Sequence, residues 1–510
     1  MKHRRILSGL AALMLAASLP MSALAREWDI ADGDITIVAD NDGQKVSQGT
    51  ENDISDDNPI IIGNSATNTV SIVAEKDQTA NVTLSGANID GSTKGNAAVS
   101  TTGEGNVSIE LDGDSTLKSG FCHAGLEKNN GGSLTIADED KNGKLTSEGG
   151  GYGAGIGGGN RGTGSDITIS GGEVNATGGA YGAGIGGGWG GSGSDITISG
   201  GEVKATGGAY GAGIGGGYEA GGSDIAISGG EVNATGGGAY GAGIGGGWGG
   251  SGSDITISGG EVKATGGSYG AGIGGGYSGD GSDITVSGGE VKATGGVNGA
   301  GIGGGLQGKG KDITVSGDAK LKVQGGVESW TGGAGAGIGN GGSKADGNQI
   351  PGAEVEPDTS DLTTGWIEYY APGADMDKDA PSQTIVGTYI PPQPAREAAA
   401  PAQPTAPLYR VTDGDGKDVR YETTWRDGVL TVTVEADRAV LTGRLSSIAS
   451  LQAQGIERIV FITKGATSEF LTADLLAAAP ATERYALTHD GETVTFTAGE
   501  ADVSGILVKA

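Results

Sequence analysis

The sequence is poor in the residues that build disulfides, metal centres and catalytic dyads. Its 510 residues include one cysteine, Cys122, and three histidines. A single cysteine excludes an intramolecular disulfide, so the chain has to be stabilised by packing. His123 and His489 lie far apart, and no Ser/His/Asp or metal-ligand spacing accompanies either of them. The sequence therefore gives little support for an enzyme.

Basic residues and long apolar runs are also scarce. Asp and Glu number 62 against 32 Lys and Arg, a formal net charge of −30. Such a polyanion argues against nucleic acid as a partner and against unaided docking to anionic lipid. After the first 25 residues no run reaches the roughly 18 apolar residues that a membrane-spanning helix needs, so we expect no membrane insertion.

The first 25 residues have the layout of a secretory signal peptide. Lys2, Arg4 and Arg5 precede an apolar run over residues 6–19, and a small-residue step follows at residues 23–25. We therefore expect the mature chain to begin near Arg26 and to be secreted, either free in the extracellular space or associated with the cell surface.

Glycine is abundant, with 108 residues, and much of it belongs to a repeat. The isoleucine of the block Gly-Ala-Gly-Ile-Gly-Gly-Gly recurs in steps of 29, 29, 30, 29 and 29 residues, at Ile156, Ile185, Ile214, Ile244, Ile273 and Ile302. Within each unit apolar and polar residues alternate, as in Ile196-Thr197-Ile198, which indicates strands with one buried face. Such a unit can bury that face only by stacking on its neighbours. The sequence therefore predicts a right-handed parallel β-helix of about 29 residues per coil.

Composition divides the mature chain into four segments. We predict an N-terminal cap over residues 26–67, the β-helix over 68–350, a Pro/Ala-rich extended linker over 351–407, and a small α+β domain over 408–510. The last segment is large enough for its own core, but its sequence indicates no chemistry.

Two aromatic rows follow the repeat. In the third strand the alternation that points Ile185 inward also points Tyr181 inward and turns the glycines outward. We therefore expect a buried stack of Tyr152, Tyr181, Tyr210, Tyr240 and Tyr269, and a flat glycine floor outside it. The second row, four residues after each isoleucine, gives the candidate carbohydrate-binding residues Trp189, Tyr218, Trp248 and Tyr277. These rings either stack on sugars or cover hydrophobic edges of the coil, and both interpretations stay open.

Acidic residues recur in the same way. Aspartates open the first strand of each coil and glutamates the second, where they either cap turns or hold cations. Separately, Asp138, Asp140 and Asn142 resemble the start of a calcium-binding loop, but Gly149 stands where a bidentate glutamate is needed, which favours a polar turn. Calcium is thus the one candidate cofactor, and these three residues are its candidate ligands. Cys122 falls in the tyrosine position of its coil, which predicts a buried thiol.

The coils over residues 68–342 resemble a known family. Residues 123–126 (His-Ala-Gly-Leu), residues 132–136 (Gly-Ser-Leu-Thr-Ile) and the Tyr-Gly-Ala-Gly-Ile-Gly-Gly-Gly blocks are similar to the carbohydrate-binding β-helix domains of clostridial surface proteins. The resemblance covers a little over half of the chain and implies a fold like that of pectate lyases, binding of plant polysaccharide and calcium, and little or no catalysis. It transfers no individual binding residue.

Three functions are compatible with these patterns. The first is a secreted, non-catalytic carbohydrate-binding or adhesive β-helix whose partner is a polysaccharide or a cell-surface glycan. The second is a structural spacer or matrix protein of the cell surface, in which length is the function. The third is a calcium-dependent polysaccharide lyase.

Overall fold

The structure is a computed structural model that describes residues 25–387, 409–413, 417, 419–426, 428–453, 455–478, 484–491, 493–499 and 501–507. The chain divides into two compact units between residues 390 and 391. The predicted signal peptide, apart from Ala25, and the part of the predicted linker beyond residue 387 lie outside the described residues. No helix within the described residues has the length and apolar character needed to cross a bilayer.

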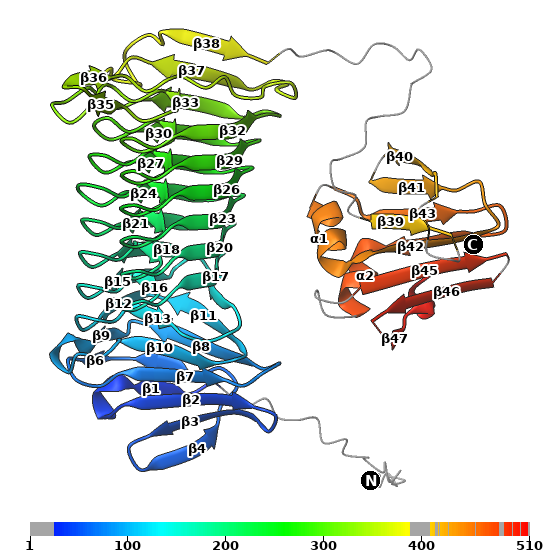
Figure 1. Ribbon diagram of the computed structural model, residues 1–510. Helices are drawn as coiled ribbons and strands as arrows, with labels where there is room; N and C mark the ends of the chain where they lie inside the picture. The colour runs from blue at the N-terminus through cyan, green and yellow to red at the C-terminus, as the bar shows by residue number, and fades with distance from the viewer. Residues whose placement is uncertain are drawn as a thin grey trace, which may run out of the picture. The chain divides into compact units, whose positions relative to one another are not determined.

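The first unit is a parallel β-solenoid, which confirms the predicted fold class. Successive coils add one strand to each of three sheets that run along the stack (Figure 1). Sheet A contains β1 (Glu27–Asp29), β5 (Ile60–Ile62), β8 (Thr79–Ser85), β11 (Asn106–Asp112), β14 (Leu134–Ala137), β17 (Gly164–Ile169), β20 (Gly193–Ile198), β23 (Gly222–Ile227), β26 (Gly252–Ile257), β29 (Gly281–Val286) and β32 (Gly310–Val315).

The other two sheets follow the same order. Sheet B contains β2 (Ile35–Asp40), β7 (Val70–Ala74), β10 (Val99–Gly103), β13 (Leu126–Lys128), β16 (Ile156–Gly157), β19 (Ile185–Gly186), β22 (Ile214–Gly215), β25 (Ile244–Gly245), β28 (Ile273–Gly274), β31 (Ile302–Gly303) and β34 (Ile338–Gly339). Sheet C contains β6 (Asn64–Ser65), β9 (Asn88–Asp90), β12 (Asp114–Lys118), β15 (Lys144–Glu148), β18 (Glu173–Thr177), β21 (Glu202–Thr206), β24 (Glu231–Thr235), β27 (Glu261–Thr265), β30 (Glu290–Thr294), β33 (Lys320–Gln324) and β37 (Trp366–Tyr370).

Columns of identical apolar residues fill the inside of the solenoid. In one coil Ile196, Ile198, Ala205 and Ile214 are fully buried, and each pairs in register with the same residue type one coil away. Burying one such isoleucine contributes about 1.5–3 kcal/mol, and a single coil offers too few of them to fold alone. The stacking of coils is therefore the source of the stability.

Extra strands close both ends of the solenoid. At the N-terminal end β3 (Gly43–Gln48) pairs antiparallel with β2, and β4 (Glu51–Ser55) with β3. At the C-terminal end β38 (Gln383–Val386) pairs antiparallel with β37, and Glu354 accepts hydrogen bonds from the backbone N–H groups of Gly337 (2.7 Å) and Ile338 (3.0 Å). The carboxylate stands where the next coil would have placed carbonyl groups, so the end of sheet B has no unpaired donors at these residues.

The linker prediction is wrong for residues 351–387, because β37 extends sheet C by pairing in parallel with β33. The segment predicted as a cap likewise contains strands of all three sheets, since β2 pairs with β7, β5 with β8 and β6 with β9. A short hairpin, β35 (Ser343–Ala345) and β36 (Asn348–Ile350), projects near the C-terminal end.

The expected glycine floor is also wrong, because the glycine blocks are buried. Gly182, Gly184 and Gly186 are all buried, and a Cβ on Gly184 would lie 2.6 Å from the backbone N of Thr206 in the next coil. Gly186 has a φ of 129° and would also clash with the carbonyl of Gly215. Backbone packs directly on backbone here, and only glycine allows that approach.

The second unit is a small α+β domain rich in strands, as predicted. Its first sheet has the order β39 (Tyr409–Thr412), β42 (Arg438–Arg444), β45 (Arg484–Asp490), β46 (Thr493–Ala498) and β47 (Ala501–Asp502). Its second sheet has the order β40 (Glu422–Arg426), β41 (Val429–Thr433), β43 (Arg458–Ile462) and β44 (Thr467–Leu471), with the helices α1 (Leu445–Ala453) and α2 (Thr472–Ala478). Phe461, Phe470 and Phe496 are fully buried in its core.

Candidate functional site

A ladder of aromatic rings follows one edge of the solenoid. Its tyrosine column has ring centroids 5.3, 5.0, 5.2 and 5.6 Å apart from one coil to the next, along Tyr152, Tyr181, Tyr210, Tyr240 and Tyr269. Phe121 starts this column, 4.5 Å from Tyr152 and 62 % exposed. The stacking follows from the parallel register, which places equivalent residues of neighbouring coils one strand spacing apart.

The predicted carbohydrate-binding residues form a second, mixed column beside the first. Trp248 stacks on Tyr218 at 4.8 Å and on Tyr277 at 6.2 Å, with interplanar angles of 7° and 5°. Across the two columns the tyrosines meet edge to face, as in the pair Tyr181 and Tyr218 at 5.5 Å and 86°, whereas Tyr152 and Trp189 are tilted by 32° at 5.4 Å. Both columns together are called the aromatic ladder below. Each such ring pair adds about 0.5–1.5 kcal/mol beyond its buried area.

Ring faces in the ladder are covered by other rings. Tyr210 lies between Tyr181 and Tyr240, and Trp248 lies between Tyr218 and Tyr277. A sugar ring consequently has no free face to stack on in the middle of the ladder. What remains accessible is the outer edge of each ring, because the tyrosines and tryptophans of both columns are only half-buried.

Polar tips point out of the ladder. Within the described residues the hydroxyls of Tyr181, Tyr210 and Tyr240 and the indole N–H of Trp248 have no hydrogen-bond partner, and none of these atoms is buried. Partial burial, followed by the nearby carboxylate of Glu219, raises the pKa of the Tyr218 hydroxyl. The surface is thus an apolar strip with hydrogen-bonding groups at the spacing of the coils.

The tyrosine column was expected to be buried, and that prediction is wrong. Tyr181 lies in a turn that precedes the two-residue strand β19, so the inward alternation of Ile185 and Ala183 does not extend to it. The buried thiol predicted at Cys122 is also wrong, since Cys122 is exposed and the preceding Phe121 enters the column. Sequence reasoning therefore found both rows but not their contact with each other.

The C-terminal end of the ladder is closed by side chains of another kind. Leu306 takes the next position of the mixed column and is buried. Asn298 takes the tyrosine position, donates to the carbonyls of Gly332 and Gly333 (both 2.7 Å), and accepts from Ser329 (2.7 Å). These bonds fold the loop around residue 330 over the end of the ladder, and Trp330 in that loop is 78 % exposed.

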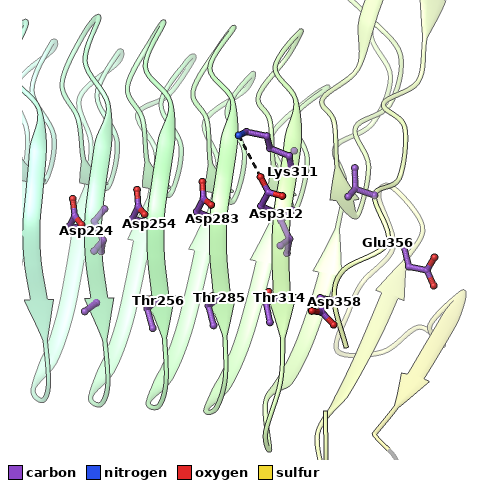
Figure 2. Close-up of a pocket in the computed structure, with 15 residues that line it drawn as sticks. Asp224, Asp254, Thr256, Asp283, Thr285, Lys311, Asp312, Thr314, Glu356 and Asp358 are labelled. Carbon is purple, nitrogen blue, oxygen red and sulfur yellow. Dashed lines mark ion pairs between the residues drawn. The ribbon is translucent and has the colours of Figure 1, made fainter. Parts of the chain in front are cut away.

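Sheet A carries a groove lined by acidic side chains. The groove of about 1120 Å³ has Asp224, Asp254, Asp283 and Asp312 along one side and Thr256, Thr285 and Thr314 along the other, and Glu356 and Asp358 close one end (Figure 2). Lys311 is the basic residue of this lining and lies 3.5 Å from Asp312. The carboxylates in this row can accept hydrogen bonds from a chain that lies along the sheet, and the threonine hydroxyls can both donate to it and accept from it.

The aspartates occupy a stacked bulge. Asp195 and Asp224 both have a φ of 53° and do not pair with each other across the coils. The residues on either side of them do pair, Ser194 with Ser223 and Ile196 with Ile225. In the described residues no backbone N–H donates to the carboxylates of Asp195, Asp224, Asp254 or Asp283, so the predicted turn-capping role is wrong at these positions. Neighbouring charges about 4.8 Å apart repel by about 1 kcal/mol in water.

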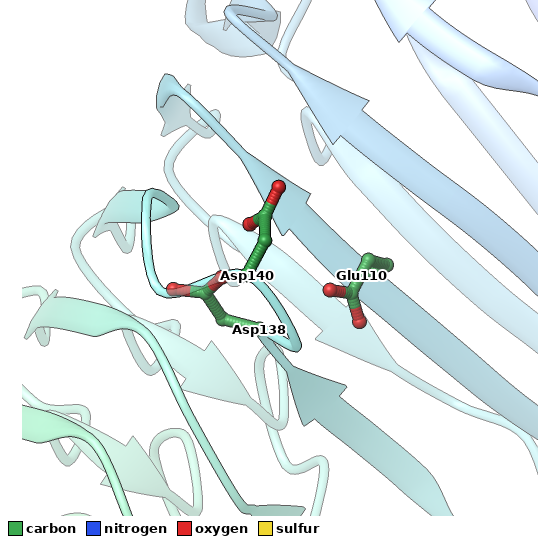
Figure 3. A group of neighbouring side chains, drawn as sticks. All are labelled: Glu110, Asp138 and Asp140. Carbon is green, nitrogen blue, oxygen red and sulfur yellow. The ribbon is translucent and has the colours of Figure 1, made fainter.

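Two of the three predicted calcium ligands meet a third carboxylate. Oxygens of Glu110, Asp138 and Asp140 lie within 4.8 Å of one another (Figure 3). Burial raises the pKa of Glu110, and the negative charges of Glu139, Asp138 and Asp140 raise it further. The hydrogen bond that Glu110 accepts from the N–H of Glu139 acts in the opposite direction and lowers the pKa in part. Sequence reasoning missed Glu110 because it lies one coil earlier, and an alignment of the coils was the signal that could have found it.

The calcium-loop interpretation fits these residues only in part. Both oxygens of Asp138 accept backbone N–H bonds, from Lys141 at 2.8 Å and from Gly143 at 3.0 Å, which is the polar turn that the sequence favoured. The Asn142 side chain donates to Asp140 (2.9 Å) and accepts from Gly113 (3.3 Å), so its oxygen is engaged elsewhere. Glu110 and Asp140 are the residues that fit a divalent cation best, since hard cations prefer carboxylate oxygen.

A buried polar cluster, also missed from the sequence, lies at the N-terminal end of the ladder. The Glu127 carboxylate is buried and takes hydrogen bonds from the N–H of Ala124 (3.0 Å) and the side chain of Asn129 (2.8 Å), with His123 Nδ1 at 2.8 Å. Burial lowers the pKa of Lys128. These two charged residues replace glycines of the regular coils, and that replacement was the available signal.

A comparison with known protein families agrees with the stacked coils of the first unit. A family model described as a beta helix repeat matches residues 167–189, 196–218, 225–248, 255–277 and 284–306. These five segments are β-helix repeats. Each repeat begins at the first buried isoleucine of a sheet A strand and ends on the mixed column or on Leu306. Searches of curated proteins and of solved structures found no match.

Proposed function

We propose that the protein is an exported, non-catalytic binding rod that holds a linear, neutral polysaccharide along its aromatic ladder. The observation that carries the proposal is the pair of half-exposed ring columns that follows the coils from Tyr152 to Tyr277. Aromatic bodies with polar tips suit ligands that present both C–H groups and hydroxyls.

The net charge of the protein and the shape of the ladder limit which ligands can bind. A net charge of −30 repels an acidic polymer, whereas a neutral glycan is not repelled. The ladder is straight and repeats with each coil, so it suits an extended chain rather than a branched one. Because the ring faces are covered, the glycan contacts ring edges, phenol hydroxyls and indole N–H groups. Each contact is weak, and affinity comes from their repetition.

Binding to a panel of insoluble and soluble neutral polysaccharides tests this function. We expect affinity for soluble oligosaccharides to rise with chain length until the ligand spans the ladder, roughly 20 Å over five coils. The double variant Trp189→Ala/Trp248→Ala is expected to lose at least tenfold in affinity. Trp425→Ala is the matched control, since Trp425 is 57 % exposed and lies in the second unit. Unchanged binding of the double variant would remove the ladder from the proposal.

A second candidate, a structural spacer, is favoured by one observation. Interior rings of the ladder cover each other's faces, as rings do when their role is to stiffen a rod. Deleting residues 196–224 removes one coil and joins Asp195 to Ile225 in register. If the protein is a structural spacer, it keeps its spacer function after this deletion. If it is a binding rod, it loses affinity for ligands that span the whole ladder.

A further inference from the structure

The tyrosine column combines three properties that matter for oxidation. Its neighbouring rings lie 5.0–5.6 Å apart, its residues are half-buried with accessible hydroxyls, and the indole ring of Trp189 lies 5.4 Å from Tyr152. Tyr210 and Tyr240 are nearly parallel, with an interplanar angle of 6°. An electron removed from one ring can therefore be replaced from the next, so that a radical formed anywhere in the column is shared along it.

We propose that the tyrosine column is an oxidative cross-linking site that joins two copies of this chain through dityrosine bonds. A heme peroxidase with hydrogen peroxide is the oxidant. Each of two tyrosines loses one electron and one proton and becomes a phenoxyl radical. The peroxide O–O bond breaks as peroxide takes up both electrons and both protons, and two waters form. The radicals join through a carbon–carbon bond between ring positions next to the hydroxyls, and each ring recovers its hydroxyl when the hydrogen at the joined carbon moves to oxygen.

The geometry directs this coupling between copies and not along one column. Tyr181, Tyr210 and Tyr240 meet face to face, and the end pairs Tyr152–Tyr181 and Tyr240–Tyr269 are tilted at 54° and 39°, whereas a bond between ring carbons requires that two edges meet. The outer edges of Tyr181, Tyr210 and Tyr240 face solvent, where a second ladder can present its own edges. The full sequence carries a net charge of −30, and removal of Lys2, Arg4 and Arg5 makes the mature chain more negative still. The copies therefore repel, and cross-linking is expected to speed up as added salt screens the charge. Cross-linking of this kind does not require polysaccharide binding.

The test compares the full mature chain with a variant in which the whole tyrosine column is replaced. Phenylalanine keeps the rings and removes the phenols, so the variant carries five Tyr→Phe changes, at Tyr152, Tyr181, Tyr210, Tyr240 and Tyr269. Tyr409→Phe/Tyr421→Phe is the control in the second unit. All three proteins are treated with a heme peroxidase and hydrogen peroxide, and circular dichroism checks that the fold is unchanged.

The readouts are dityrosine fluorescence, covalent oligomers on a denaturing gel and mass spectrometry of the linked peptides. We expect the parent and the control to form covalent dimers and larger species through peptides of the column, and the column variant to lose at least fivefold in rate. Equal cross-linking of the column variant, linked peptides from the second unit alone, or tyrosine oxidation without dityrosine would each overturn the proposal. Dityrosine in chains that stay monomeric would overturn the coupling between copies.

Discussion

A glycine in the third segment of a coil gives the sharpest test of how the coils pack. Gly243 is buried, and a Cβ placed on it would lie 2.6 Å from the carbonyl oxygen of Gly272, 2.7 Å from the N of Thr265 and 3.0 Å from the carbonyl oxygen of Ala234. All three atoms are backbone, so none can rotate away, and two of them belong to the next coil. The carbonyl of Gly272 also accepts the N–H of Ile244 at 3.0 Å.

Gly243→Ala is therefore expected to destabilise the solenoid by about 3 kcal/mol, the upper end of the range for overpacking a closed site. The matched control is Gly238→Ala, because Gly238 is exposed and a Cβ there meets nothing within 4 Å. That change is expected to shift stability by no more than about 0.5 kcal/mol. Guanidinium unfolding of the mature chain gives the stability, and hydrogen exchange of the coil around residue 243 locates the loss.

The two outcomes separate buried from exposed glycine blocks. If the glycines formed an open floor, as strand alternation alone predicts, both alanine variants would be equally stable. Equal stability of Gly243→Ala and Gly238→Ala would refute the close packing of backbone on backbone.

Three further predictions concern ionisable groups and backbone strain. Burial lowers the pKa of His489 to about 4, so between pH 6.5 and 4 the unfolded second unit binds more protons than the folded one. Its free energy of unfolding should fall by about 3 kcal/mol as pH drops through that window, and His489→Gln should flatten this dependence in unfolding curves followed by circular dichroism. Glu110→Gln removes a partly buried charge whose pKa is raised, so it should increase the melting temperature in a chelator; if calcium fills the cluster, added calcium should stabilise the parent protein more than the variant. Asp195→Gly relieves a φ of 53° and the repulsion from the carboxylates of Asp166 and Asp224, so it should stabilise the solenoid by about 1 kcal/mol in denaturant titrations, and a loss of stability would contradict the strain.

Much of the solenoid could be predicted from the sequence because its signal is local. Ile196 and Ile198 lie in the extended strand β20, where alternation fixes which side chains are buried. The same rule failed at Tyr181, since it applies only to extended backbone and Tyr181 lies in a turn. The composition places the strand Trp366–Tyr370 in the linker, because the prolines between residues 391 and 407 dominate that segment, although the pairing of the strand with β33 is regular.

The candidate surfaces depend on contacts between coils, which a single repeat does not reveal. Glu110 meets Asp138 only because one coil stacks on the next. The aspartate bulge requires a positive φ at Asp195, and nothing in the Ser-Asp-Ile pattern distinguishes that conformation from an ordinary turn. Likewise the two aromatic rows were visible, but their edge-to-face contact depends on the path of the loop between them.

Neighbouring coils stack in parallel and in register, and an engineered disulfide between two coils can establish this register chemically. Lys204 pairs with Asn233 in the next coil and with Asn175 in the previous one. In a Cys122→Ser background, Lys204→Cys/Asn233→Cys places two Cα atoms about 4.8 Å apart, within the range of a disulfide, whereas Asn175→Cys/Asn233→Cys places them roughly 9.6 Å apart. Mild oxidation followed by mass spectrometry of free thiols should show a closed disulfide in the first protein and two free thiols in the second. Free thiols in the first, or disulfides formed equally in both, would contradict the stacked register.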